Sequence, residues 1–392
     1  MKKRIVSILG AAVVCTAVAS ASDGFSIKGE IPGLKAGTKV ELLSKERDGH
    51  GSLAEAVATD GAFVLTGSVK SPSICELRID VSNEDGNMLD RSFRLMVENI
   101  PMTVSAAHLD SVPPGFYFGT GGLMMEKNVS ITGGQAQKEF AEFNEAMFPY
   151  VFAAKTAHYN LYVDEKRDKS EEGEKRLEAA YEAANVDEAK ARRRFMEEHP
   201  SYSVSGYYWN DILSEPFSFT SAELDALHEK LKTQTDTARL NRLERTIDYA
   251  RKYQRGTQYT DFAVLDTIGG ERRASEFAGP GKYMMVDFWA SWCGPCRASI
   301  PHVRELYNTY GDRLAILSVS VDSAEKPWRK AMDQERMEWT QLWANKDKME
   351  TIRDAYQLTS IPYMLIINPD GQIIYAGHDP AEVSALLAAE ME

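Results

Sequence analysis

Cysteine is scarce in this sequence, with 4 among 392 residues, at positions 15, 75, 293 and 296. A small exported domain held together by disulfides needs a denser set, so a disulfide framework is excluded. A closed zinc site needs four ligands, and no second closely spaced cysteine pair accompanies Cys293 and Cys296. His302 alone does not complete such a tetrahedral site, and we therefore expect no bound metal.

Positive charge is also in short supply. The chain has 45 Lys and Arg against 58 Asp and Glu, a formal net charge of −13. This balance argues against nucleic acid or an anionic membrane surface as a partner. No glycine-rich nicotinamide or flavin fingerprint is present, so we expect no such cofactor.

A long hydrophobic run is missing as well. The one apolar run near the start, Ile5 to Ala19, follows three basic residues and is shorter than the roughly 18 to 20 residues that span a bilayer. It is typical of a secretory signal, predicted here as residues 1–21, with cleavage after Ala19 or Ala21. Val14 is not the small residue expected before a lipidated cysteine, which favours cleavage over lipid anchoring at Cys15. We expect a periplasmic protein without a membrane span after cleavage.

The chemistry-bearing stretch that is present is Trp292-Cys293-Gly294-Pro295-Cys296. The apolar run Tyr283–Trp289 before it predicts a buried strand of a parallel sheet, and apolar spacing over Arg297–Tyr310 predicts a helix. Cys293 would thus lie at a helix N-terminus, where unpaired N–H groups favour its thiolate. We predict Cys293 as the nucleophile. Cys296, one turn later and more buried, is predicted as the resolving thiol.

Three regions with different patterns fill the rest of the chain. Residues 23–134 are β-rich and predict a sandwich or small barrel, with Cys75 as a small core residue. The expected strands are Val40–Leu43, Ala62–Val69, Ile74–Val81, Phe93–Val97 and Met102–Ala106. Residues 135–258 predict long amphipathic helices over a charge-rich stretch from Asp164 to Glu198 and a run from Ser221 to Tyr253, the latter capped by Thr220 or Ser221. The aromatic residues between Tyr202 and Phe219 are expected to pack between helices.

Residues 259–392 return to alternating strands and helices, which predicts an α/β domain with a partly parallel sheet and the cysteine turn at a strand's carboxyl end. The expected strands are Phe262–Leu265, Tyr283–Trp289, Leu314–Val321, Gln341–Ala344, Tyr363–Ile367 and Gln372–Ala376, and the expected helices are Arg297–Tyr310, Pro327–Glu335, Met349–Tyr356 and Ala381–Met391.

This third region resembles a thioredoxin-fold oxidoreductase of the TlpA/ResA type. The residues that carry the resemblance are Val286 to Arg297, Pro301, Thr359-Ser360-Ile361-Pro362 and Asn368-Pro369-Asp370-Gly371. The stretch from about Val321 to Trp343 is similar to the insertion of that family. The β-rich region resembles the N-terminal β-domain of exported Bacteroidetes-type proteins, on the residues Gly29 to Leu34, Thr59 to Phe63 and Ile131 to Gly134.

The resemblance implies roles for several residues. Pro362 is expected to form a cis peptide bond facing the redox-active disulfide, and Ile361 to offer its backbone to an extended substrate segment. Trp292 would shape the docking surface, and Gly294 and Pro295 would form the turn between the two cysteines.

Asp287 interrupts an apolar strand, so its pKa should be raised, as suits a proton acceptor for Cys296. The alternative is a purely structural carboxylate. The sequence departs from ResA-type reductases at Ser299, where they carry a glutamate, and from thioredoxin at Ser318, where we place thioredoxin's buried lysine. Proton transfer is therefore expected to be closer to that of thioredoxin, and a role in cytochrome c maturation is in doubt.

The leading prediction is an exported protein-disulfide reductase that uses Cys293 and Cys296 and no cofactor besides its redox-active disulfide. Gly294-Pro295 resembles the reducing type, so a membrane thiol donor is expected to supply electrons for oxidised envelope proteins. The alternatives are an isomerase or thiol peroxidase, or an envelope binding protein with an accessory redox module.

Overall fold

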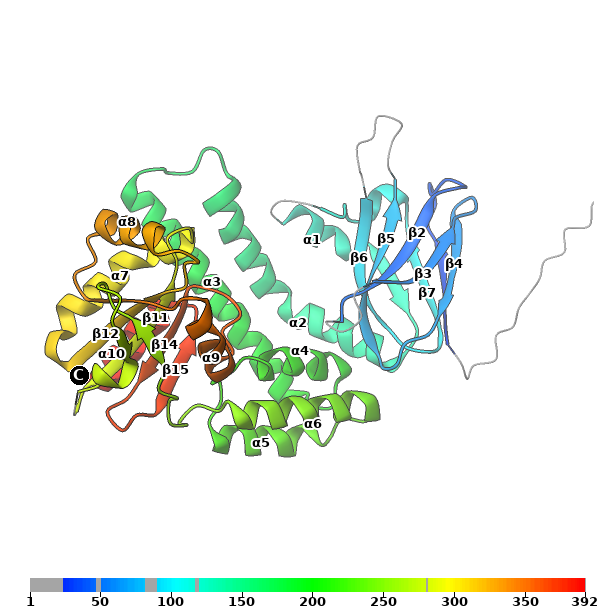
Figure 1. Ribbon diagram of the computed structural model, residues 1–392. Helices are drawn as coiled ribbons and strands as arrows, with labels where there is room; N and C mark the ends of the chain where they lie inside the picture. The colour runs from blue at the N-terminus through cyan, green and yellow to red at the C-terminus, as the bar shows by residue number, and fades with distance from the viewer. Residues whose placement is uncertain (1–23, 47–50, 82–89, 117–119, 280, 392) are drawn as a thin grey trace, which may run out of the picture. The chain divides into compact units, whose positions relative to one another are not determined.

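The computed structural model describes residues 24–46, 51–81, 90–116, 120–279 and 281–391. The predicted signal peptide and Cys15 lie outside these residues. The chain divides into two compact units, one of residues 1–195 and 202–204 and the other of residues 196–201 and 205–392. Figure 1 shows the β-rich part of the first unit and, in the second, a sheet flanked by helices.

The β-rich part consists of two four-stranded sheets, with strand orders β4-β1-β7-β8 and β3-β2-β5-β6. The strands are β1 (Phe25–Glu30), β2 (Lys39–Ser44), β3 (Gly51–Val57), β4 (Ala62–Gly67), β5 (Ser73–Asp80), β6 (Asp90–Val97), β7 (Pro101–Ala106) and β8 (Val129–Thr132). Apolar side chains of both sheets form one buried cluster that includes Ile27, Leu42, Leu65 and Leu77. The prediction of a strand-rich N-terminal domain is confirmed.

Sequence patterns missed three of these strands, β1, β3 and β8, as well as the short helix α1 (Gly121–Glu126). β3 lies at an edge of its sheet and has no buried residue, so it lacks the alternation that identifies a half-buried strand. β8 has only four residues, too few for a period to be recognised.

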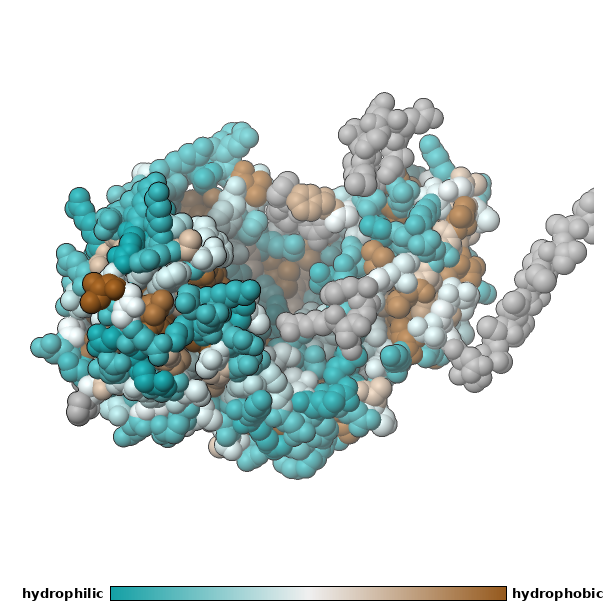
Figure 2. Space-filling model, in the orientation of Figure 1, coloured by the Kyte–Doolittle hydropathy of each residue, from teal (hydrophilic) through white to brown (hydrophobic). Residues whose placement is uncertain are grey.

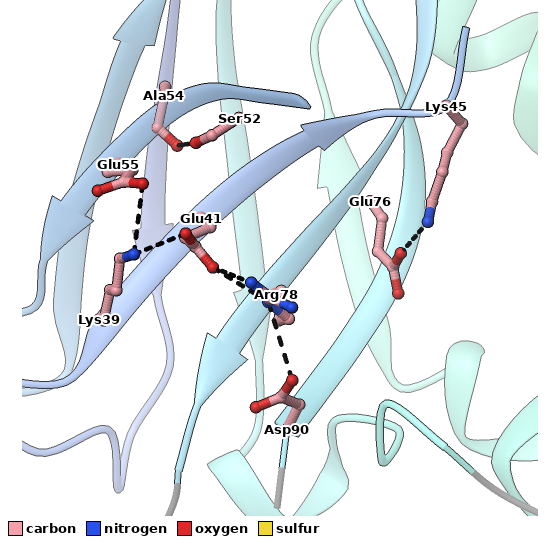
Figure 3. A network of polar contacts seen from close by, with 9 residues as sticks. All are labelled: Lys39, Glu41, Lys45, Ser52, Ala54, Glu55, Glu76, Arg78 and Asp90. Atoms are coloured by element: carbon pink, nitrogen blue, oxygen red, sulfur yellow. Dashed lines mark hydrogen bonds and ion pairs between the residues drawn. The ribbon is translucent and has the colours of Figure 1, made fainter. Parts of the chain in front are cut away.

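Charged residues form a network across β2 and its neighbours (Figure 3). Glu41 of β2 lies between Lys39 and Arg78, and Lys45 pairs with Glu76. Hydrogen bonds from Lys39 and Arg78 lower the pKa of Glu41 to about 2. Because the folded-state pKa lies below the ordinary value of 4.5, this pairing stabilises the fold above about pH 4.5 and is lost as the pH falls toward 2.

The helical stretch is divided between the two units. α2 (Gln135–His158), a π-helical turn (Tyr159–Val163) and most of α3 (Glu171–Glu198) belong to the first unit, whereas α5 (Ser221–Leu231), α6 (Thr237–Lys252) and most of α4 (Ser203–Leu213) belong to the second. In the second unit, Met196 packs with Trp209, Leu213, the leucines of α5 and Leu243 of α6. The outer surface of α5 and α6 is mostly hydrophilic (Figure 2).

Two expected helices differ from the observed ones. The charge-rich helix begins at Glu171 rather than Asp164, since Asp164 and Asp168 accept hydrogen bonds from the backbone N–H groups of Lys166 and Ser170 and hold turns instead. The run from Ser221 to Tyr253 is two helices, because Asp236 caps a new one at Thr237. Thr220, one of the two expected caps, caps the first of them, and it does so in a capping box with Glu223.

Half of the aromatic residues expected between helices are buried, namely Trp209, Phe217 and Phe219. Trp209 and Phe219 are buried among α4, α5 and α6. Phe217 instead packs into the core of the α/β domain, and its backbone N–H donates to the carbonyl oxygen of Tyr253 at 2.5 Å. Phe217 thereby connects the three helices to the α/β domain within the second unit.

The α/β domain is built on a seven-stranded sheet with the order β10-β9-β13-β12-β11-β14-β15. Its strands are β9 (Ala263–Leu265), β10 (Glu271–Arg273), β11 (Tyr283–Trp289), β12 (Leu314–Ser320), β13 (Thr340–Trp343), β14 (Tyr363–Ile367) and β15 (Ile373–Gly377). β11, β12 and β13 are parallel to one another, and β14 is antiparallel to β11. The predicted α/β fold is confirmed, although the short β10 was not predicted.

Helices cover both faces of this sheet. α7 (Gly294–Tyr310), α8 (Glu325–Glu335) and α10 (Pro380–Met391) contribute to one buried cluster, and α9 (Lys346–Tyr356) contributes to the other. The side chains of β11 alternate between the two clusters: Met285 and Trp289 belong to the first, and Val286 and Phe288 to the second. Asp287 therefore shares the face that α7 covers.

Candidate active site

The two cysteines lie where β11 gives way to α7, as predicted. Cys293 is the N-cap residue of α7, and Pro295 occupies the first turn, where a missing N–H costs nothing. The sulfur of Cys293 accepts a hydrogen bond from the backbone N–H of Cys296 at 3.2 Å. A disulfide joins the two sulfur atoms, with Cα atoms 5.3 Å apart. Cleavage of this disulfide would leave the Cys293 sulfur at the positive end of a helix.

Access to the pair is from the Cys293 side. Cys293 is 5% exposed and Cys296 is 1% exposed, while the neighbouring Trp292 is 69% exposed. A large apolar ring in water beside the more accessible sulfur offers a contact surface for another chain.

The segment opposite the disulfide contains the Ile361–Pro362 bond, which is cis as predicted. The Cys293 sulfur lies 3.9 Å from the carbonyl oxygen of Ile361. The Pro362 carbonyl oxygen lies 2.5 Å from Nδ1 of His378, and a carbonyl can only accept, so this nitrogen carries the hydrogen. The His378 ring also packs against Tyr363. Nothing in the sequence around His378 indicated this role.

A second residue missed by sequence reasoning is Asp322, which holds the turn before the cysteines. One carboxylate oxygen accepts from the Ser291 N–H at 2.9 Å and from the Ser320 hydroxyl at 2.8 Å, and the other accepts from the Ser291 hydroxyl at 2.6 Å. Asp322 is 2% exposed. A fully bonded buried carboxylate of this kind fixes the position of the backbone that leads into Cys293.

Replacement of Asp322 by alanine should lower the free energy of unfolding by about 2 to 3 kcal/mol, because buried donors lose a charged acceptor. It should also slow disulfide reduction, since the turn loses its anchor. Urea unfolding and a reduction assay would measure the two effects. Asp333→Ala, at an exposed position of α8, is the matched control and should change stability by less than about 0.5 kcal/mol. Equal effects of the two variants would contradict the anchoring role.

Asp287 is buried beneath α7 at 2% exposure. Burial raises its pKa to about 6, and a hydrogen bond from the Ser318 hydroxyl, at 2.8 Å from Oδ2, acts in the opposite direction. Ser299, which stands where ResA-type proteins carry a glutamate, donates its hydroxyl to the carbonyl oxygen of Cys296 at 2.8 Å. The site therefore contains one buried carboxylate with a pKa close to neutrality.

Cys75 differs from this pair in reactivity. It is fully buried in the core of the β-rich domain, and burial raises the pKa of its thiol to about 12. Its sulfur therefore stays protonated and unreactive at neutral pH. Within the residues that the structure describes, no three His, Cys, Asp or Glu side chains gather closely enough to hold a metal ion. Among those same residues, no helix is sufficiently long and apolar to cross a membrane.

Two family models match this chain. Residues 281–373 match the family described as thioredoxin-like, and residues 25–140 match a domain of unknown function (DUF4369). The first match contains β11, the cysteine turn and the cis Ile361–Pro362 bond. The second covers the two sheets of the β-rich domain and the start of α2.

Curated relatives match in the same C-terminal part. The thioredoxin-like protein YneN of Bacillus subtilis is 42% identical over 73 residues, 19% of this chain and 42% of that protein. The thiol-disulfide oxidoreductase ResA of Oceanobacillus iheyensis is 32% identical over 94 residues, 24% of this chain and 47% of that protein. This chain thus spans about half the length of these two relatives.

Solved structures likewise match only about a third of this chain. The thioredoxin domain of a thiol-disulfide oxidoreductase from Bacteroides vulgatus is 25% identical and covers 35% of this chain and 98% of that one, with a TM-score of 0.33. A thiol:disulfide interchange protein from Bacteroides sp. is 26% identical and covers 34% and 88%, with a TM-score of 0.32. From the family match and the cysteine pair, residues 281–373 form a thioredoxin-like domain, and this part of the chain is similar to thiol-disulfide oxidoreductases such as ResA.

Proposed function

We propose that this protein reduces disulfides of envelope proteins by dithiol-disulfide exchange. The observation that carries the proposal is a cysteine pair at the N-terminus of α7 whose outer sulfur lies 3.9 Å from the backbone of the cis Ile361–Pro362 segment. A strand-like client segment can pair with the backbone of Ile361 and bring its own disulfide to that sulfur. The exposed ring of Trp292 supplies an apolar contact beside it.

The reaction has two exchange steps. The Cys293 thiolate attacks one sulfur of the client disulfide, a Cys293–client disulfide forms, and the other client sulfur leaves with the electron pair and takes up a proton. The Cys296 thiol then gives its proton to Asp287, its sulfur attacks the Cys293 sulfur, and the second client sulfur leaves with the electron pair and takes up a proton. The client disulfide becomes two thiols, and the enzyme dithiol becomes the disulfide seen in the structure.

Direction depends on the relative reduction potentials of the partners. Gly294-Pro295 between the cysteines is similar to the reducing members of the fold, which supports a reductase. A reductase in an oxidising compartment needs continuous re-reduction, and a membrane thiol donor fits that need. No cofactor besides the disulfide itself takes part in the steps above.

Trapping with Cys296→Ser tests this function. The variant keeps the attacking sulfur but cannot resolve the mixed disulfide, so envelope proteins should accumulate on Cys293 as adducts that dithiothreitol releases. Cys293→Ser/Cys296→Ser is the matched control and should capture nothing. The captured chains would identify the clients. If no adduct forms and the wild-type protein does not reduce a model disulfide, the proposal fails.

The same trap separates the alternatives. An isomerase would be trapped mainly on clients with several cysteines and would restore activity to a scrambled protein, whereas a peroxidase would consume hydrogen peroxide rapidly without a protein client. A binding protein with an accessory redox module would keep its cellular role in Cys293→Ser.

We also propose export through residues 1–21, on the pattern of basic residues, apolar run and small residues near Ala19 and Ala21. The protein purified from the periplasmic fraction should begin at Ser20 or Ser22. A mature chain that still begins at Met1, or a lipid-modified N-terminus at Cys15, would contradict cleavage at these positions.

A further inference from the structure

Asp287 lies on the face of β11 that α7 covers, where the neighbouring groups are almost all uncharged. Its partner across β14 is Met364, and α7 brings Cys296 and Ile300 to the same cluster. α8 contributes Trp328. Among these neighbours Cys296 carries a thiol only when the disulfide is reduced, and burial and the Ser318 hydrogen bond are the causes that shift the pKa of Asp287. The protonation of Asp287 is thus governed by very few contacts.

Ser318 has a second partner besides Asp287. Nε1 of Trp339 lies 2.8 Å from the Ser318 hydroxyl oxygen, and that oxygen lies 2.8 Å from Oδ2 of Asp287. An indole N–H can only donate, so the serine oxygen must accept from Trp339. Ser318 has one hydroxyl hydrogen, and that hydrogen points to Oδ2 of Asp287. Trp339 thus occupies one of the two lone pairs of the serine oxygen, and an ionised Asp287, which can only accept, fixes the direction of the second hydrogen bond.

The other oxygen of Asp287 is in a different situation. Oδ1 is buried and has no hydrogen-bond partner among the described residues. A proton on Oδ2 would turn the Ser318 hydrogen away from Asp287, whereas a proton on Oδ1 leaves the Ser318 hydrogen bond to Oδ2 in place. The protonated form therefore keeps the Ser318 bond at Oδ2 and carries its hydrogen on Oδ1.

We propose that Trp339 and Ser318 are positioning residues for Asp287, which together direct the proton released by Cys296 to the Oδ1 atom. The inference rests on the proposed function for its role in turnover, but the protonation of Asp287 can be measured without turnover. By holding a donor on Oδ2 in both protonation states, the pair stabilises the carboxylate more than the acid and so limits how far burial raises the pKa of Asp287. The single hydroxyl of Ser318 thereby supplies part of the stabilisation that a buried cation would give to the carboxylate.

Trp339 also separates this buried group from an open cavity. The cavity has a volume of about 660 Å³ and is lined by Trp339 together with residues of α8, β13 and the β9–β10 turn. Loss of the indole would let water reach Ser318 and act as a substitute donor. Phenylalanine keeps most of the ring in place, so Trp339→Phe is the informative replacement.

Infrared difference spectroscopy of the full-length oxidised protein tests the proposal, because Cys293 and Cys296 are then joined and do not titrate. Asp287→Asn identifies the carbonyl band of protonated Asp287 by its absence. In the wild type we expect one band, shifted down by the Ser318 hydrogen bond to Oδ2. Ser318→Ala should move the band to higher wavenumber and raise its titration midpoint by about one pH unit. Trp339→Phe should raise the midpoint less and split the band, because a hydroxyl that no longer accepts from the indole N–H accepts more readily from protonated Asp287.

Trp328→Phe is the matched control, since Trp328 is fully buried in the same cluster and its indole nitrogen has no hydrogen-bond partner among the described residues. It should leave band and midpoint unchanged. An unchanged band in Ser318→Ala, or equal shifts in Trp339→Phe and Trp328→Phe, would overturn the inference. These readouts are independent of the trapping experiment. Shifted bands without client adducts would refute only the reductase function. Client adducts with unshifted bands would refute only the positioning role of Trp339 and Ser318.

Discussion

Replacement of Cys293 by serine should abolish disulfide reduction, with a loss of at least about 1,000-fold in rate. A serine hydroxyl is not ionised at neutral pH and forms no disulfide, so the first exchange step has no attacking atom. The backbone N–H of Cys296, which now meets the cysteine sulfur at 3.2 Å, can bond a serine oxygen instead, so the fold should persist. A turbidity assay with insulin as the disulfide and dithiothreitol as the reductant would measure the loss.

Cys75→Ala is the control for this experiment. Cys75 is the remaining cysteine among the described residues, and burial raises the pKa of its thiol to about 12, so its sulfur should contribute nothing to exchange. The variant should reduce insulin at the wild-type rate, although a smaller buried side chain lowers its stability. Residual activity in Cys293→Ser that disappears with Cys75→Ala would show that the attacking sulfur had been assigned wrongly.

The parts of the site that could be predicted are those whose structure depends on residues close together in the sequence. The cysteine turn follows from five consecutive residues between an apolar strand and an amphipathic helix. β11 and β14 have the predicted bounds because each is a mostly apolar and almost fully buried run, which Asp287 interrupts in β11. The cis bond at Pro362 came from family resemblance rather than from local chemistry.

The parts that could not be predicted depend on contacts between distant positions. Asp322 meets Ser291 across 31 residues of sequence, Trp339 meets Ser318 across 21, and His378 meets Pro362 across 16. The sequence around each of these side chains gives no sign of its role, because the order of the strands decides which distant residue it contacts. The division of the helical stretch is of the same kind, since packing of Trp209 and Leu213 against α5 and α6, and not helix propensity, holds most of α4 in the second unit.

Replacement of Asp287 by asparagine should slow the resolving step by about 100-fold at pH 7, because Cys296 loses its proton acceptor. In the wild type the step needs the carboxylate form, so its rate should rise as the pH passes through about 6. The variant should lack this rise. Single-turnover release of a client thiol from the mixed disulfide would measure it. Asp312→Asn, at an exposed position, should match the wild type. A variant with the wild-type rate and pH profile would make Asp287 a structural carboxylate only.

The same substitution should stabilise the protein at the pH where it slows the reaction. The folded-state pKa of Asp287 is raised from 3.8 to about 6, so its contribution to stability is fully present below pH 3.8 and is lost as the pH rises through 6. Two pH units correspond to about 3 kcal/mol, which is the most that Asp287→Asn can regain at pH 7. Urea unfolding of the oxidised wild type and of the oxidised variant should show a difference in unfolding free energy at pH 7. This difference should be smaller near pH 4. If Asp287 were only a structural carboxylate, Asp287→Asn would be less stable than the wild type. A variant that gains stability and loses rate therefore identifies Asp287 as a buried charge that is retained for chemistry.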